Sequence, residues 1–428
     1  MTNIGYYDST NNTGALNPDN LPFEVVERKF RGHPDSLADM IAQSFAQKYI
    51  FHAWDKFPEL ERKYFPNFSA DKVTLAGASS SFENTQVTIK SPVHALLIGK
   101  ITQNIGDVDM GVDDLFKASI EDVMSTCLHT DTYKQHIERQ MYAVNLAGVD
   151  RGQHFYNPQT VSDLITILQN ETYATSTVYV VAYAPLSVTE KLTIFLDNFT
   201  NSPEFAHSFP AIGSDIKALV RRNGSEFDIS LCLPVRPEIT STIDGYNSVV
   251  KSATETIEAV VLNYLKNSGS IYIDPKIRMH VNTKDTESKK YFAVWGTALS
   301  KGDIGAVGRG NRQQGFISGI RPSTGEAISG KNPYHFSGVI YQIVADNISN
   351  EIFIRTGLKN IVYITANNGD SLKNPSLVDV LLESSNPSYK AIIDEIIHET
   401  LNNLDMLRTE YIVTNPIERF MKPKSYLL

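Results

Sequence analysis

The chain comprises 428 residues with a formal net charge of −9, of which 42% are apolar and 20% charged. This length allows two or three domains, and the composition is that of an ordinary globular protein. No apolar run approaches the ~20 residues of a membrane span, and the acidic balance argues against general nucleic-acid binding. We therefore expect neither a membrane nor a nucleic acid as a partner.

Residues 1–20 are polar and rich in Asn, Thr and Gly, which predicts a flexible N-terminal arm and no hydrophobic secretion signal. The two cysteines, Cys127 and Cys232, lie in apolar surroundings without CxxC spacing. We expect both to be buried thiols and the protein to be cytoplasmic, where thiols stay reduced.

The first half of the chain predicts strands and helices in turn. Residues 23–30 alternate as in a strand, and apolar residues between 36 and 54 recur with helical spacing. Further elements are predicted as strands at 72–78 and 85–90, which we expect to pair, helices at 114–127 and 160–168, and a buried strand at 178–183.

The second half continues this mixture, with helices predicted at 189–196 and 247–265 and strands at 226–233, 271–281 and 291–295. The order has no strict βαβ repeat. It therefore predicts an α+β fold in which helices cover one face of each sheet.

Residues 301–334 form a glycine-rich stretch that also contains several basic residues. Eight glycines alternate there with Arg309, Arg312, Arg321 and Lys331. Glycine lets backbone N–H groups approach an anion, and Arg and Lys supply countercharge. In an acidic chain this indicates a site for a small polyanion, although a basic surface loop is the alternative.

Residues 325–332 within this stretch come close to the phosphate-binding P-loop pattern. The spacing is one residue short, and Asn332 stands where Ser or Thr would ligate magnesium. The preceding residues 320–324 read as a turn instead of a buried strand, and Pro333 follows at once. We therefore disfavour a true P-loop.

A second constellation, Glu27, His33, Asp35 and Asp39, lies at the first strand-to-helix junction. A helix start favours an anion, and Mg²⁺ prefers one or two carboxylates together with phosphate oxygens. Asp303 supplies a second carboxylate. The alternative is that Asp35 caps the helix and His33 is a turn residue.

Several ordered motifs resemble the archaeal-type S-adenosylmethionine synthetases (methionine adenosyltransferases). They are ERKxxGHPDSxAD at 27–39, YAPLSxTEK at 183–191, FPAxGxDIK at 209–217, GDxGxVGRGNR at 302–312 and GKNP at 330–333. The chain is thus identified as a divergent member of this family.

The resemblance implies three similar α/β subdomains around a pseudo-threefold axis. We expect a first subdomain at about 21–135, a second at 136–268 and a third at 269–428, with their strands interlaced. It also implies a homodimer, or a dimer of dimers, with active sites at the subunit interface. The implied reaction is attack of methionine sulfur on C5′ of ATP, after which the triphosphate is hydrolysed to phosphate and diphosphate.

The resemblance also implies roles for single residues. His33 would hydrogen-bond the departing oxygen, Glu27 would bind the methionine amino group, and Asp35 and Asp303 would hold Mg²⁺. The side chains expected around the triphosphate are Lys217, Arg309, Arg312, Lys331 and His335. Bacterial relatives also use K⁺, for which no site is predicted.

Three positions depart from the family pattern. Ser176 stands where the family has an Asp that contacts adenosine, Ile304 replaces a second Asp, and Val339 replaces a Lys. Two alternatives therefore stay open: a nucleosyltransferase of the same mechanism with another nucleotide or thioether, and a non-catalytic nucleotide-binding subunit. The retained His33, Asp35 and Asp303 argue against the second.

Overall fold

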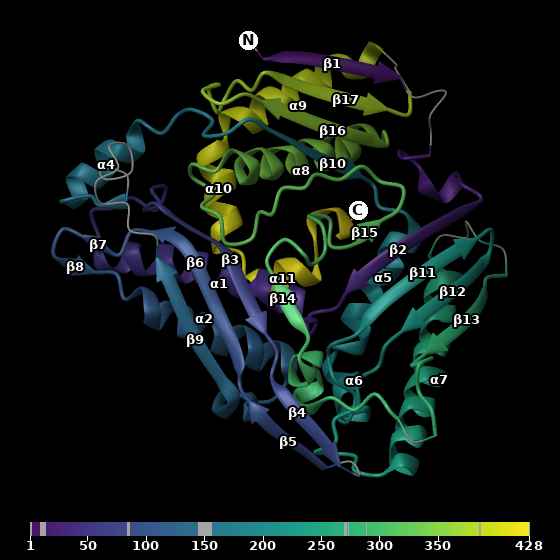
Figure 1. Cartoon of the computed structure of the whole chain (residues 1–428). Helices are drawn as coiled ribbons and strands as arrows, with labels where there is room; N and C mark the ends of the chain where they lie inside the picture. Colours follow the sequence, from purple (N-terminus) through teal and green to yellow (C-terminus); the bar gives the residue numbers. More distant parts are fainter. Residues whose placement is uncertain are drawn as a thin grey trace.

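The computed structural model describes residues 2–8, 14–83, 86–143, 156–268, 272, 274–287, 289–384 and 387–427. Three sheets, each covered by helices, surround a common centre (Figure 1). Three hydrophobic cores correspond to these three units, and a smaller apolar cluster joins two of them. The predicted α+β fold class is confirmed.

The first unit is a sheet in the order β14-β3-β6-β9, packed against two long helices. Its strands are β3 (Phe68–Ala76), β6 (Val93–Ile101), β9 (Ile137–Ala143) and β14 (Ile304–Ala306), and its helices are α1 (Pro34–Lys56), α2 (Val112–Leu128) and α4 (Val161–Gln169). Two small hairpins extend it, β4 (Ser79–Glu83) with β5 (Gln86–Ser91) and β7 (Asn104–Ile105) with β8 (Val108–Asp109). Helix α1 is buried along most of its circumference because the sheet, α2 and the C-terminal helices all contact it.

The second unit is a sheet in the order β13-β12-β11-β2-β15. Its strands are β2 (Phe23–Lys29), β11 (Lys217–Asn223), β12 (Glu226–Leu231), β13 (Lys276–Val281) and β15 (Ile317–Ser318), and its helices are α5 (Val188–Thr200), α6 (Pro203–Ser208) and α7 (Ile243–Asn267). Strand β2 alternates, burying Glu24, Val26 and Arg28 and leaving Glu27 and Lys29 on the open face. This alternation sends the predicted site residue Glu27 and its neighbour Lys29 toward the same face.

The third unit is a sheet in the order β1-β17-β16-β10 under helices α8 and α9. Its strands are β1 (Asn3–Asp8), β10 (Val178–Ala184), β16 (Asn360–Ala366) and β17 (Leu377–Leu382), and its helices are α8 (Ser337–Thr356), α9 (Lys390–Asn402) and α10 (Leu404–Val413). Strand β1, from the segment expected to be an arm, pairs in parallel with β17. A last helix, α11 (Pro416–Met421), lies near the centre of the molecule (Figure 1).

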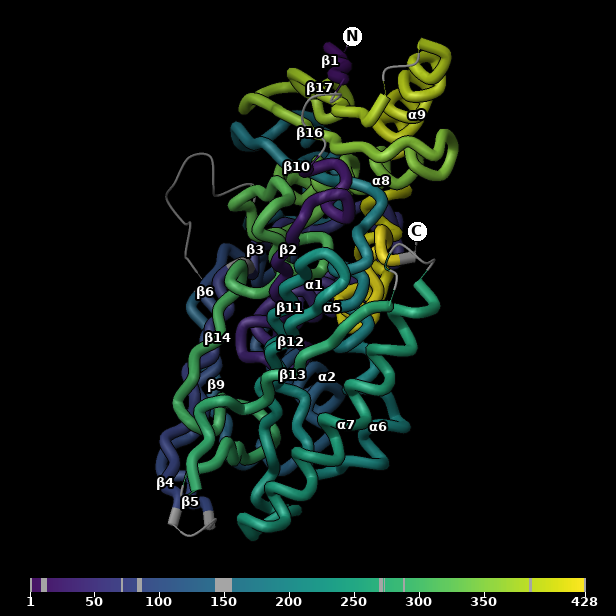
Figure 2. Tube along the Cα trace, turned by 90° about the vertical axis from the view of Figure 1, so that its right-hand side faces the viewer, coloured from purple at the N-terminus to yellow at the C-terminus, as the bar shows by residue number. Residues whose placement is uncertain are grey.

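Turned by 90°, the chain shows strands β3, β6, β9 and β14 on one side and helices α6, α7 and α9 on the other (Figure 2). The open sheet faces carry exposed apolar side chains, including Ile98, Tyr142, Tyr179, Leu219 and Ile304. Among the described residues, none of the helices combines the length and apolar character required to cross a membrane.

Three predictions about local structure were wrong. The strand predicted at 72–78 pairs with β6 and β14, whereas the one predicted at 85–90 pairs with β4. The strand predicted at 291–295 is interrupted because Trp295 has φ = 59° and begins no sheet pairing, inside the 3-10 helix Val294–Gly296. Cys127 is buried as predicted, but Cys232 is exposed. The division into three consecutive subdomains stays a proposal.

Candidate functional site

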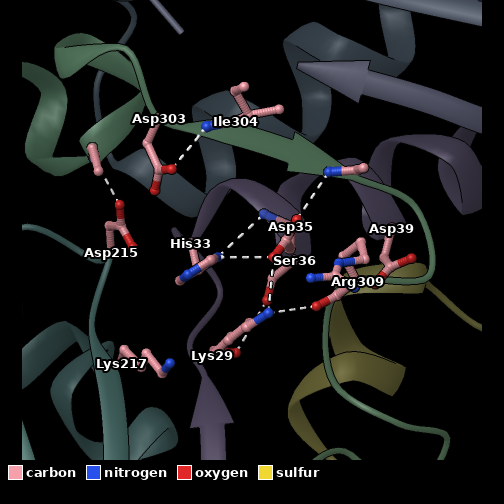
Figure 3. Close-up of polar contacts among 12 residues, drawn as sticks. Lys29, His33, Asp35, Ser36, Asp39, Asp215, Lys217, Asp303, Ile304 and Arg309 are labelled. Carbon is pink, nitrogen blue, oxygen red and sulfur yellow. Dashed lines mark hydrogen bonds and ion pairs between the residues drawn. The ribbon is translucent and has the colours of Figure 1, made fainter. Parts of the chain in front are cut away.

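The glycine-rich stretch lies directly on the start of helix α1. The backbone N–H of Ala306 donates to Asp35 Oδ1 at 2.9 Å (Figure 3). The backbone N–H of Gly308 donates to Asp39 Oδ1 at 2.9 Å. A Cβ atom on Gly305 would lie 2.1 Å from the Pro34 carbonyl oxygen, so only glycine permits this approach. The two constellations predicted from the sequence are therefore one site.

His33 is the N-cap residue of α1, and its ring acts as a hydrogen-bond acceptor. Nδ1 accepts the backbone N–H of Asp35 at 3.2 Å. Burial, partly offset by the Asp35 carboxylate, lowers the pKa of His33 to about 4. The ring is thus neutral at pH 7, so the 4.0 Å separation between Nδ1 and Asp35 Oδ2 is no ion pair. With Nδ1 accepting, the single ring proton is on Nε2, which becomes a donor.

Asp35 is held at both carboxylate oxygens. Oδ1 accepts the Ala306 N–H, and Oδ2 accepts the Lys29 ammonium at 2.8 Å. The Lys29 Nζ also donates to the carbonyl oxygen of Arg309 at 2.5 Å. The Lys29 ammonium group therefore connects the start of helix α1 to the glycine-rich stretch.

Two further aspartates lie on the other side of His33 (Figure 3). Asp215 is buried and accepts the Ala298 N–H at 2.7 Å and the Thr297 hydroxyl at 3.2 Å. Burial, followed by the charges of Asp303 and Asp35, raises the pKa of Asp215 to about 7. Asp303 is exposed, and its Oδ1 accepts the N–H of the next residue at 2.9 Å. The site thus concentrates negative charge on this side.

Lys217 and Glu27 form an ion pair of 3.0 Å across strands β11 and β2. The Lys217 side chain is 45% exposed and that of Glu27 25%, so both are accessible to a ligand. Exposed ion pairs are weak, and an anionic ligand can therefore recruit Lys217 at little cost.

The remaining predicted cations lie along the glycine-rich stretch. Arg309 and Arg312 are exposed, and the Lys331 Nζ contacts Glu326 Oε2 at 3.2 Å. Arg321 differs from these three: it is buried and bonds both carboxylate oxygens of Glu190 at 2.9 and 3.0 Å. It is thus a structural residue that fastens the stretch to helix α5.

Ser176 and His335 belong to the third unit. Ser176 is exposed ahead of β10, and His335 is buried just before α8. Their segments meet where the Thr175 hydroxyl donates to the His335 carbonyl oxygen at 2.8 Å. Burial, and then the Arg408 cation, lower the pKa of His335 to about 3, so its ring is neutral. His33 and its neighbours Lys29 and Asp35 lie instead between the first and second units. The triphosphate role of His335 stays a prediction.

The donor set can be tested against Mg²⁺. Among the described residues, no group of three or more His, Cys, Asp or Glu side chains lies close enough to hold a metal alone. Mg²⁺ needs only one or two protein carboxylates when phosphates supply further oxygens. Asp35 and Asp303, whose charges both act on His33, fit that requirement.

Sequence reasoning assigned no role to Lys29 or Asp215. Lys29 is two residues after Glu27 on a strand and therefore lies on the same face. This spacing could have identified Lys29 as a site residue from the sequence. Asp215 is equally two residues before Lys217, but its burial depends on Thr297 and Ala298, far along the chain. Only the tertiary structure shows that contact.

Comparison with known proteins identifies the family of the chain. A model of the S-adenosylmethionine synthetase (AdoMet synthetase) family matches residues 11–415. An S-adenosylmethionine synthase of Methanocaldococcus jannaschii is 30% identical over 368 residues, covering 84% of this chain and 85% of the relative. One of Methanococcus aeolicus is 28% identical over 415 residues, covering 94% and 96%.

Two further similarities extend over most of the chain. An uncharacterized protein of Streptococcus pyogenes is 25% identical over 394 residues, covering 91% of this chain and 92% of the relative. An unusual S-adenosylmethionine synthetase from Campylobacter jejuni, of known structure, is 14% identical, covers 95% of this chain and 98% of its own, and superposes with a TM-score of 0.53. The chain belongs to the S-adenosylmethionine synthetase family as a divergent member.

Proposed function

We propose that the protein is a methionine adenosyltransferase that forms S-adenosylmethionine from ATP and L-methionine and releases phosphate and diphosphate. The observation that carries this proposal is the neutral His33 ring. Its Nδ1 is occupied by the Asp35 N–H, and its Nε2–H is therefore available to a leaving oxygen.

The residues suit a displacement that needs no general base. A thioether sulfur is a neutral nucleophile, so the barrier lies in the triphosphate, which gains charge as the C5′–O bond breaks. The Nε2–H of His33 donates to that oxygen as the charge develops. Lys217, Arg309, Arg312 and Lys331 surround the remaining phosphates.

Mg²⁺, when bound by Asp35, Asp303 and phosphate oxygens, neutralises part of this charge. The Lys29 ammonium group supplies a second positive charge beside Asp35. Glu27 takes the methionine amino group, once Lys217 has turned from the carboxylate to the triphosphate.

We further propose a homodimer with the active sites at its interface. The exposed apolar side chains on the open sheet faces support this, since a partner subunit would cover them. A cytoplasmic enzyme is consistent with the two unpaired cysteines, Cys127 and Cys232.

The test is an incubation of the purified protein with ATP, L-methionine, Mg²⁺ and K⁺, read by mass spectrometry for S-adenosylmethionine. Parallel reactions with GTP, CTP and UTP, and with L-ethionine, separate this function from a nucleosyltransferase with other substrates. The matched control is His33→Asn, which can still accept the Asp35 N–H but places no donor at Nε2. Absence of any adenosylated product from the wild type, with nucleotide still bound, would support the non-catalytic alternative.

A further inference from the structure

Behind the glycine-rich stretch lie two adjoining cavities of about 120 and 250 Å³. Both are bounded by Gln313, Gln314, Tyr411, Arg419 and Pro423. The larger one also has the apolar side chains Ala182, Ile343 and Leu407 in its wall. The C-terminal segment that includes α11 closes both, near the centre of the molecule (Figure 1).

Asp346, on helix α8, reaches the larger cavity with its carboxylate. Its Oδ1 accepts two amide N–H groups, from Gln314 at 2.9 Å and from Gln342 at 3.0 Å. Its Oδ2 accepts one, from Gln313 at 3.0 Å. A carboxylate oxygen accepts two hydrogen bonds, so within the described part of the chain Oδ2 keeps one acceptor position.

Gln342 presents a second acceptor one helical turn away. Its Nε2 donates to the Val181 carbonyl at 3.0 Å and to Asp346 Oδ1 at 3.0 Å. Because both partners are acceptors, the amide orientation is fixed and Oε1 points elsewhere. The side chain is fully buried, it lines the smaller cavity, and no described residue donates to its Oε1. Buried acceptors are normally satisfied, which points to a donor from outside the chain.

We propose that the two cavities form one binding site for a small organic cation, a primary ammonium group on an apolar body. The three N–H donors of an ammonium suit Asp346 Oδ2 and Gln342 Oε1, and the apolar wall suits hydrocarbon. A bare alkali ion could use the same acceptors but would leave the apolar side chains Ala182, Ile343 and Leu407 without a contact.

The other charges around the cavities do not change this choice. Glu410 and Lys424 are exposed and pair with each other at 2.8 Å, and Glu418 and Lys422 are exposed as well. Exposed charges contribute little to binding. Arg312 lines the smaller cavity but is exposed.

Arg419 donates to the Tyr411 carbonyl at 2.8 Å and lies 3.8 Å over the Tyr411 ring, so its charge is already engaged. Of the three carboxylates that line the larger cavity, Asp346 is the one that is not exposed. Gln313 and Gln314 directly follow Arg312 in the sequence, so the occupant also contacts the glycine-rich stretch.

The probe is n-hexylammonium chloride, compared with 1-hexanol and with KCl at equal ionic strength. Binding to the full-length protein is measured by titration calorimetry and by the thermal unfolding midpoint, with no nucleotide present. We expect a saturable rise in Tm with hexylammonium and an affinity for 1-hexanol at least about 10-fold weaker, since a charge-assisted hydrogen bond is lost.

Two variants test the assignment. Asp346→Asn should weaken hexylammonium at least about 10-fold for the same reason. Ile343→Trp fills the larger cavity while the Asp346 carboxylate is retained, and it should abolish binding even if Asp346→Asn fails to fold. Glu418→Gln, at the exposed rim, is the matched control and should bind as the wild type does.

Equal affinity for 1-hexanol, an equal saturable effect of KCl, or undiminished binding by a folded Asp346→Asn or Ile343→Trp protein would overturn the proposal. The absence of saturable binding would also overturn the proposal, and it would indicate that ordered water satisfies Asp346 Oδ2 and Gln342 Oε1. Because the assay contains no substrate, each of these results leaves the proposed transferase activity untouched.

Discussion

Removal of the Asp39 carboxylate should loosen the glycine-rich stretch. Asp39 accepts the Gly308 N–H at 2.9 Å, and the Gly310 backbone and Ser329 side chain also stabilise its charged form. Each hydrogen bond to a charged group contributes ~1.5–3 kcal/mol, whereas burial of the carboxyl offsets part of this. For Asp39→Ala we expect a net loss of ~2 kcal/mol, which lowers Tm by roughly 2 °C in a chain of this size.

Asp39→Ala should also lower kcat/KM, and this effect should be larger than its effect on Tm. A displacement of about 1 Å in a positioning segment costs ~10²-fold in rate, so kcat/KM for S-adenosylmethionine formation should fall by about that factor. Asp55→Asn, at an exposed position of the same helix, is the control and should alter neither quantity. If Asp39→Ala keeps the Tm and kcat/KM of the control, the carboxylate does not hold the stretch.

The pH dependence of Asp39→Asn checks the same argument. Burial raises the pKa of Asp39 from 3.8 to about 7. As pH rises through this window the unfolded chain releases its proton before the folded one, so the wild type loses stability. The Tm advantage of the wild type over Asp39→Asn should therefore shrink between about pH 4 and 7. A constant or growing advantage would contradict it.

Lys217→Ala and Lys331→Ala should each lower turnover at least ~10²-fold while the fold survives, because one preorganised charge contact to the triphosphate is lost; near-normal turnover in both would refute these roles. Asp35→Asn should abolish turnover and weaken nucleotide binding only when Mg²⁺ is present, and intact wild-type turnover in EDTA would make Asp35 a structural cap. The ¹⁵N signals of His33 should stay those of a neutral ring down to about pH 5, and an NMR midpoint near 6.5 would contradict this. Because the pKa of His33 is about 4 in the folded protein and 6.5 in the unfolded chain, the folded state should lose stability as pH drops from 6.5 to 4. Ser176→Asp should lower the KM for ATP and restore ~1.5–3 kcal/mol of discrimination against other nucleotides, whereas strict ATP preference in the wild type would show that another residue makes the contact.

The first site motif could be predicted from the sequence because its signals are local. Alternation over 23–30, proline at the helix start and helical periodicity after it specify β2, the His33 turn and α1, and the structure has all three. Family resemblance joined this junction to the glycine-rich stretch. The hydrogen bonds from Ala306 and Gly308 give that link a physical form.

Features that depend on distant partners could not be predicted in the same way. Strand β3 pairs with β6 instead of with β5, and it packs against α1, so its partner depends on the tertiary structure. Apolar residues around Trp295 resemble a strand, yet the backbone turns there to let Gly296 lie against Gly213. The exposure of Cys232 likewise follows from its place just beyond β12, not from its apolar neighbours.

The pairing of β1 with β17 has a consequence for the newborn chain. Asn3 finds its partner Leu377 only after nearly the whole protein has been synthesised. At ~5–20 residues per second, the first strand leaves the ribosome tens of seconds before its partner strand exists. During that interval an unpaired edge with Tyr6 and Tyr7 is open to wrong partners, and such long-range closure is intrinsically slow. We therefore expect the third unit to fold last.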